Sequence, residues 1–164
     1  MKNLLPACIA LLLFGVSCSE QKNSLSFSIS FTQELSDQAQ DGRLLIMLAN
    51  NDKSEPRFQI SDGLSTQLVF GIDVEGMKPG QEIVINNENA FGFPIRNLKD
   101  IPTGDYYAQA LINRYETFNL KTGHTVKLPP DQGEGQQWNR KPGNFYNTPV
   151  KVSVDPAKGM EVHL

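Results

Sequence analysis

The sequence has few cysteines and histidines, and it has no run of basic residues. Only two cysteines occur, Cys8 and Cys18, which excludes a disulfide framework and a four-cysteine zinc site. The formal net charge is -3. A mildly acidic chain without a basic stretch offers no electrostatic footprint for phosphate backbones, so we expect no nucleic-acid partner.

Sequence motifs of catalysis are also missing. The chain has no Gly-x-Ser-x-Gly nucleophile elbow and no His-Glu-x-x-His metal motif. The chain has two histidines. His124 follows a turn and His163 is the penultimate residue, so we expect both to lie on the surface rather than in a catalytic site. The Gly133-Glu134-Gly135 stretch lacks the third glycine and the strand-to-helix context of a dinucleotide loop. We therefore expect no cofactor, no metal and no catalytic residue.

The N-terminus is typical of a secretion signal over residues 1–17. Lys2 precedes an apolar run from Leu4 to Phe14, which is shorter than the roughly 20 residues of a membrane-spanning helix. The sequence Gly15-Val16-Ser17-Cys18 then resembles the lipobox of bacterial lipoproteins, although Gly15 stands where leucine is usual. The resemblance implies that Cys18 is acylated; a plain secretory signal is the alternative. We expect a tether over residues 18–24 and a lipid-anchored location in the bacterial cell envelope, outside the cytoplasm.

The remaining residues, 25–164, have the length of one domain, and apolar and polar residues alternate in them as in β-strands. Leu25, Phe27, Ile29 and Phe31 alternate with serines, a period of two that only a half-buried strand accommodates. Further strands are predicted at 43–49, 67–74, 82–85, 105–116, 124–128, 150–154 and 160–164, with irregular connections at 86–99 and 131–147. Turn residues separate most of these segments, and no amphipathic helix of convincing length occurs. The pattern predicts an all-β fold, an immunoglobulin-like β-sandwich of about seven or eight antiparallel strands.

A local motif supports the sandwich. The segment from Ile101 to Tyr107 has the apolar-Pro-x-Gly-x-Tyr form that resembles the tyrosine corner of immunoglobulin-like domains. Pro102 and Gly104 would turn the chain between sheets, and the Tyr106 hydroxyl would bond back to nearby backbone. We therefore assign Pro102, Gly104 and Tyr106 a structural role.

The candidate binding residues lie in the 131–147 loop. Trp138, the only tryptophan, is surrounded by the amide side chains of Gln136, Gln137 and Asn139. An aromatic face flanked by amides suits sugar rings and peptide segments, because the ring stacks while the amides hydrogen-bond. The alternative is that Trp138 packs over a sheet edge and anchors the loop. The nearby Asp131 and Glu134 could contribute to a calcium site, but an exposed acidic loop is the commoner arrangement.

Several motifs along the chain carry a family resemblance. They are Arg57-Phe58-Gln59-Ile60, Asp105-Tyr106-Tyr107-Ala108-Gln109-Ala110, Asn113-Arg114-Tyr115-Glu116-Thr117-Phe118 and Gly135-Gln136-Gln137-Trp138-Asn139. Together they resemble the N-terminal immunoglobulin-like domain that precedes the catalytic domain in a group of large bacterial esterases. The resemblance implies an accessory domain without catalytic residues, because in such proteins those residues sit in the following hydrolase domain.

The leading functional hypothesis is therefore a membrane-anchored, non-catalytic accessory or binding module, with a glycan or a protein as its partner. The alternatives are a hydrolase fragment that lacks its catalytic domain and an envelope lipoprotein with a purely structural role.

Overall fold

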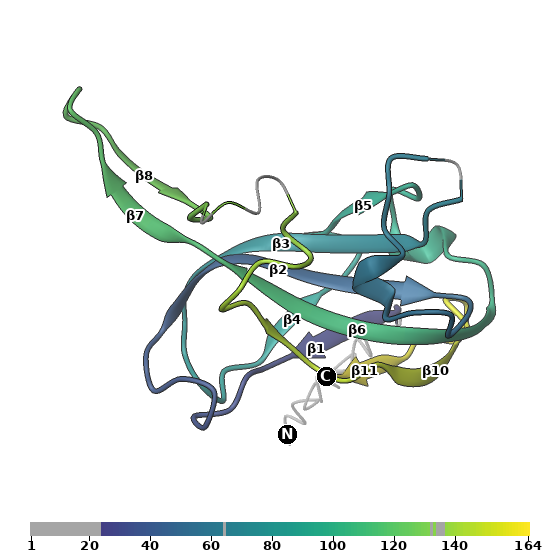
Figure 1. The fold of residues 1–164 in the computed structure, drawn as a ribbon. Helices are drawn as coiled ribbons and strands as arrows, with labels where there is room; N and C mark the ends of the chain where they lie inside the picture. Colours follow the sequence, from purple (N-terminus) through teal and green to yellow (C-terminus); the bar gives the residue numbers. More distant parts are fainter. Residues whose placement is uncertain (1–23, 64, 132, 134–136) are drawn as a thin grey trace, which may run out of the picture.

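The computed structural model describes residues 24–63, 65–131, 133 and 137–164, and this part of the chain is all-β without an α-helix (Figure 1). Its strands are β1 Ser26–Ile29, β2 Gln40–Ala49, β3 Leu68–Met77, β4 Ile83–Ile85, β5 Phe91–Phe93, β6 Gly104–Arg114, β7 Glu116–Asn119, β8 Thr125–Leu128, β9 Phe145–Tyr146, β10 Val150–Val154 and β11 Glu161–His163. Two short 3-10 turns, η1 Pro56–Phe58 and η2 Leu98–Asp100, complete the elements.

The strands form three sheets. The largest has the order β10-β6-β2-β3-β5, with β9 also paired to β6, and all its pairings are antiparallel. A second sheet has the order β11-β1-β4, in which β1 runs parallel to β11 and antiparallel to β4. Strands β7 and β8 form a hairpin that projects from one end of the molecule (Figure 1).

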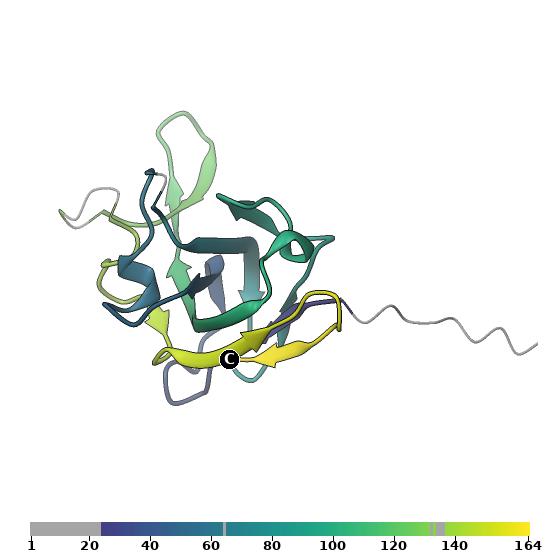
Figure 2. The same ribbon diagram turned by 90° about the vertical axis from the view of Figure 1, so that its right-hand side faces the viewer.

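The main hydrophobic core lies between the two larger sheets. Leu25, Phe27, Ile29 and Phe31 are all at most 4% exposed and meet the core residues of β2, β3 and β6, as their alternation predicted. Seen from the side, the last two strands, β10 and β11, lie next to one another although they belong to different sheets (Figure 2). The core thus joins β1 and β11 to the central strands β6, β2 and β3 of the large sheet.

The predicted strands are present, and the described residues contain three short strands that the sequence analysis did not predict. Strand β5 lies in the expected irregular connection 86–99, and β9 lies in the expected loop 131–147. Strand β7 begins at Glu116, which we had assigned to the preceding strand. Tertiary pairing explains the first two: three residues of β5 pair with β3, and two of β9 pair with β6. Runs this short carry too little periodicity to be recognised.

The structure establishes an all-β domain of several mostly antiparallel sheets, without a clear immunoglobulin sandwich. The predicted tyrosine-corner contact is present: the Tyr106 hydroxyl donates a hydrogen bond to the Pro102 carbonyl at 2.8 Å. Gly104 begins β6, and Tyr106 is only 8% exposed. Burial raises the pKa of the Tyr106 hydroxyl above its ordinary value, so it remains a proton donor.

Four predictions lie outside the described residues: the 1–17 signal, Cys18 with nearly all of the tether, Glu134 of the possible calcium site, and Gln136. Within the part of the chain that is described, no helix has both the length and the apolar character required to cross a membrane.

Candidate functional site

The face of the large sheet that turns away from the main core, called here the outer face, carries a second hydrophobic cluster. Strand register aligns Leu111, Leu45, Gly71 and Phe91 in one row across β6, β2, β3 and β5, and Gln109, Met47, Val69 and Phe93 in the next. The cluster residues Leu45, Met47, Val69 and Leu111 are at most 9% exposed. Strands β2 and β6 are therefore buried on both faces.

Two side chains from outside the sheet cover this cluster, Ile60 after η1 and Trp138 from the loop between β8 and β9. They leave open a pocket of about 240 Å³ on the outer face. We call it the Trp138 pocket, and its lining residues are Arg43, Leu45, Ile60, Val69, Phe91, Asn113 and Trp138. Pockets for drug-sized ligands run to roughly 300–1,000 Å³, so this one suits a single ring or side chain.

A buried amide lies beside the apolar floor of the pocket. Asn113 of β6 is 6% exposed, and its Oδ1 makes no hydrogen bond to any described residue. Most buried polar atoms in proteins have a partner, and leaving one without a partner costs about 1–3 kcal/mol. Asn113 thus lines the pocket and has a buried Oδ1 whose hydrogen-bonding capacity the described residues leave unused.

The charges at the pocket cancel. Arg43, which pairs with Asn113 across β2 and β6, donates to Asp73 through Nε at 2.8 Å and through Nη2 at 3.1 Å. The hydrogen bonds to Asp73 raise the pKa of Arg43, which remains a cation. Its guanidinium also lies 5.0 Å from the centre of the Phe91 ring. The pocket therefore presents hydrogen-bonding groups without a net charge.

Gly71 lets Phe91 form one wall. A Cβ at Gly71 would lie 2.6 Å from Leu45 Cδ2, closer than real Cβ atoms approach, and 3.0 Å from Phe91 Cζ, tighter than most real Cβ contacts. The missing side chain in β3 therefore makes room for the neighbouring ring.

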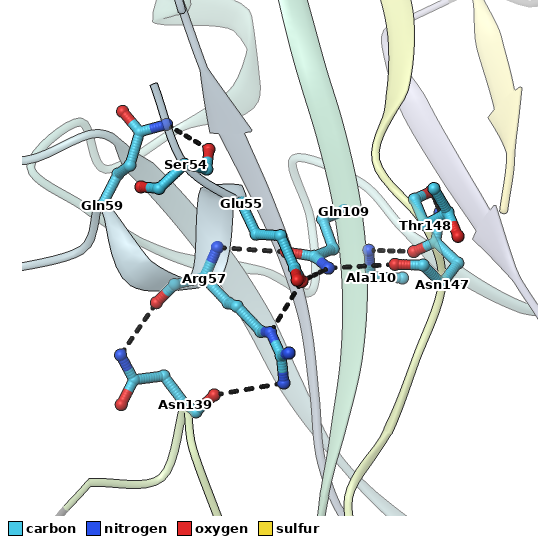
Figure 3. A network of polar contacts seen from close by, with 9 residues as sticks. All are labelled: Ser54, Glu55, Arg57, Gln59, Gln109, Ala110, Asn139, Asn147 and Thr148. Atoms are coloured by element: carbon cyan, nitrogen blue, oxygen red, sulfur yellow. Dashed lines mark hydrogen bonds and ion pairs between the residues drawn. The ribbon is translucent and has the colours of Figure 1, made fainter. Parts of the chain in front are cut away.

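On the side of the pocket formed by Ile60 and Trp138, a polar network holds η1 and the Trp138 loop in place (Figure 3). Buried Gln109 accepts the Arg57 backbone N–H at 3.1 Å and donates through Nε2 to Glu55 Oε2 at 2.8 Å and to the Asn147 carbonyl at 2.9 Å. Asn139 Nδ2 donates to the Arg57 carbonyl at 2.9 Å, and Arg57 Nε donates to Glu55. These bonds tie η1 and the Trp138 loop to the middle of β6.

The Arg57 guanidinium adds stacking contacts to this network. It lies 3.6 Å from the centre of the Tyr146 ring and 4.4 Å from that of Phe58. The hydrogen bond from Gln109 is the largest cause that holds the pKa of Glu55 below its ordinary value; burial opposes it, and Arg57 adds to it. Glu55 is thus kept ionised within the network.

The side-chain amide of Asn144 holds the backbone of Trp138 directly. Asn144 Nδ2 donates to the Trp138 carbonyl at 2.7 Å, and Asn144 Oδ1 accepts the Arg114 backbone N–H at 3.1 Å. Because Arg114 follows Asn113 in β6, these bonds fix the loop next to the buried amide.

The predicted binding residues separate into different roles. Trp138 is half-buried and lines the pocket, so its packing on the sheet and its availability to a ligand are compatible. Gln137 is exposed, Asn139 is turned toward Arg57, and Gln136 lies outside the described residues. Among the described residues that line the pocket, the amide beside Trp138 is Asn113.

Sequence reasoning missed Arg43, Phe91 and Asn113 as site residues. Phe91 and Phe93 alternate around Gly92, a short signal of extended structure inside a presumed connection. Arg43, Leu45 and Met47 share one face of β2, but only the register with β3 and β6 places them at the pocket.

The two histidines are not among the described residues that line this pocket. His124 is exposed between β7 and β8, and His163 Nδ1 lies 3.5 Å from Glu82 Oε1 beside β11. No cluster of three or more histidine, cysteine, aspartate or glutamate residues occurs among the described residues. The Trp138 pocket is accordingly the arrangement that we consider for function.

Comparison of the chain with known protein families, with curated proteins and with solved structures finds no match.

Proposed function

We propose that this domain is a non-catalytic binding module, lipid-anchored through Cys18 outside the cytoplasm, and that its Trp138 pocket binds a ring of a neutral glycan. The observation that carries the proposal is the unpartnered Oδ1 of buried Asn113 beside the aromatic wall of Trp138. The lipid anchor and the envelope location rest on the sequence around Cys18.

A sugar ring suits this arrangement because its two sides differ chemically. The C–H groups on a ring face pack on an aromatic ring, whose face is electron-rich, and the hydroxyl groups at the ring edge hydrogen-bond. Trp138 and Phe91 supply the aromatic surfaces, and Asn113 and Arg43 supply polar groups at the same pocket. The bidentate Arg43–Asp73 pair leaves no net charge for an ionic ligand.

We infer further that the domain is immunoglobulin-like and serves as an accessory to a hydrolase, as its resemblance to the esterase-linked domain implies. The hydrophobic core between the two larger sheets and the Tyr106–Pro102 hydrogen bond support the first part of this inference. In this role the module would hold its hydrolase partner near a polymer.

The test is a glycan array probed with the mature chain, together with ester-hydrolysis assays on activated substrates. We expect binding to neutral glycans, its loss in Trp138→Ala, and ester hydrolysis no faster than background. Phe118→Ala is the matched control, because Phe118 is an exposed aromatic residue of the distant β7–β8 hairpin.

Asn113→Leu separates binding from folding. Leucine has a similar volume and removes the unpartnered polar atom, so we expect unchanged or higher stability but at least about tenfold weaker binding. An array without any bound glycan, or saturable ester turnover lost in His124→Ala, would overturn the proposal.

A further inference from the structure

The aromatic surface of the outer face continues beyond the Trp138 pocket. Phe91 and Phe93 of β5 are 46% and 47% exposed, and both belong to the outer-face rows that contain the pocket floor. Phe91 lines the pocket. Phe93 pairs with the lining residue Val69 but does not itself line the pocket. The surface thus holds a second aromatic platform next to the first.

The intervening glycine holds these two rings outward. A Cβ at Gly92 would lie 2.5 Å from the ring of the core residue Phe70, so this position packs tightly against the main core. Successive residues of a strand point to opposite faces, and therefore Phe91 and Phe93 remain on the outer face. Their exposure follows from the local packing of β5.

Strand spacing separates the two platforms. The pocket floor includes Leu45 of β2, and Phe93 belongs to β5, two inter-strand spacings away or roughly 10 Å. Val69 and Phe91 at the rim of the pocket lie closer to Phe93, so it is a ring seated over Leu45 that needs a neighbouring ring to reach Phe93.

An extended peptide paired to the edge of β5 is the other occupant that this geometry suggests. Strand β5 has only three residues, and Pro94 follows it without a backbone N–H. A ladder of hydrogen bonds along this edge would therefore be short and weak. The neutral Arg43–Asp73 pair and the exposed rings instead favour an uncharged chain that lies across the strands.

We propose that the outer face binds a neutral oligosaccharide chain of at least two rings, one in the Trp138 pocket and a neighbouring one on Phe93. This inference rests on the proposed function and specifies its ligand as a polymer.

The experiment is calorimetric titration with a neutral oligosaccharide series of the linkage selected on the glycan array, from the monosaccharide to the hexasaccharide. We expect the affinity to rise by about tenfold between the monosaccharide and the longer members, since a stacked aromatic contact contributes on that order. Phe93→Ala should remove this rise and leave monosaccharide binding unchanged, while Phe118→Ala changes neither.

The possible outcomes separate the two proposals. The second platform is rejected if affinity does not depend on oligosaccharide length, or if Phe93→Ala shows the same rise of affinity with length as the unaltered domain. In either case the proposed function still holds as long as glycan binding depends on Trp138. Absence of binding to every array glycan rejects the proposed function itself, and binding confined to an extended peptide rejects the glycan as ligand.

Discussion

Two neighbouring tyrosines of β6 show how position decides the role of one hydroxyl group. Tyr106 is 8% exposed and donates to the Pro102 carbonyl at 2.8 Å, inside the corner that leads into the strand. Tyr107 points to the other face and donates to the Asp52 carboxylate at 3.3 Å in an exposed position. Water can replace the second contact but has little access to the first.

We predict that Tyr106→Phe lowers the free energy of unfolding by about 1–3 kcal/mol, because the Pro102 carbonyl loses its buried partner. Tyr107→Phe is the control and should change stability by less than about 0.5 kcal/mol. Urea denaturation of both variants measures the difference, and equal midpoints would remove the tyrosine-corner assignment.

Among the elements, β6 links the main core to the outer face. Its residues Ala108, Ala110 and Ile112 belong to the main core, while Gln109 and Leu111 point to the outer face. A glutamine that is fully buried in the longest strand is stable there because each end of its amide is hydrogen-bonded. The same bonds fix η1 and the segment that leads into β10.

We predict that Gln109→Leu destabilises the domain by about 3 kcal/mol. The substitution leaves the Arg57 N–H and the Asn147 carbonyl without their partners, and each buried unpaired group costs about 1–3 kcal/mol. Gln38→Leu, at an exposed position, should be close to neutral. Thermal and urea unfolding give the comparison; similar losses in both variants would show that the network contributes little.

At the scale of the whole molecule, folding stabilises the charged form of several carboxylates. Hydrogen bonds from Lys127 and from the Gly76 N–H lower the pKa of Asp41, as the Gln109 amide and Arg57 lower that of Glu55. Lys127 Nζ lies 2.9 Å from Asp41 Oδ2, so the first of these contacts also connects β8 to the start of β2.

We predict that stability is lost in acid. A carboxyl whose pKa is lower in the folded state contributes fully above its unfolded pKa, and this contribution disappears as the pH falls through the folded pKa. With ordinary values of 4.5 for Glu55 and 3.8 for Asp41, the loss should begin near pH 4.5 and continue below 3.8. Urea midpoints measured across this range test the prediction.

Glu55→Gln provides the comparison for the acid experiment. The variant should show a shallower fall of stability below pH 4.5, because one of the titrating carboxyls is gone. A pH profile identical to that of the unmodified domain would mean that Glu55 does not contribute.

We also predict that Cys18→Ala moves the protein from the membrane fraction to the soluble fraction, because acylation of this cysteine would supply the anchor. Detergent partitioning and the mass of the N-terminal peptide measure this, with Cys8→Ala in the signal segment as the control. An unmodified N-terminal peptide mass in the unaltered protein would contradict the lipoprotein assignment.

The sequence by itself determined which segments form the principal strands and which residues of β1 face the core. This succeeded because the period of two is a local property, and a strand that buries one face must show it in the order of its residues. The corner at Pro102, Gly104 and Tyr106 was predictable for the same reason, since its hydrogen bond joins residues only four positions apart.

Only the tertiary structure decided the Trp138 pocket and the short strands β5 and β9. Asn113, Arg43 and Trp138 belong to distant segments, and their contact depends on strand register and on the network around Gln109. Asn139, which follows Trp138 in the chain, donates to the Arg57 carbonyl, and the pocket also contains Asn113 from the distant strand β6. Register and long-range hydrogen bonds are properties of paired segments, so neither can be read from one segment alone.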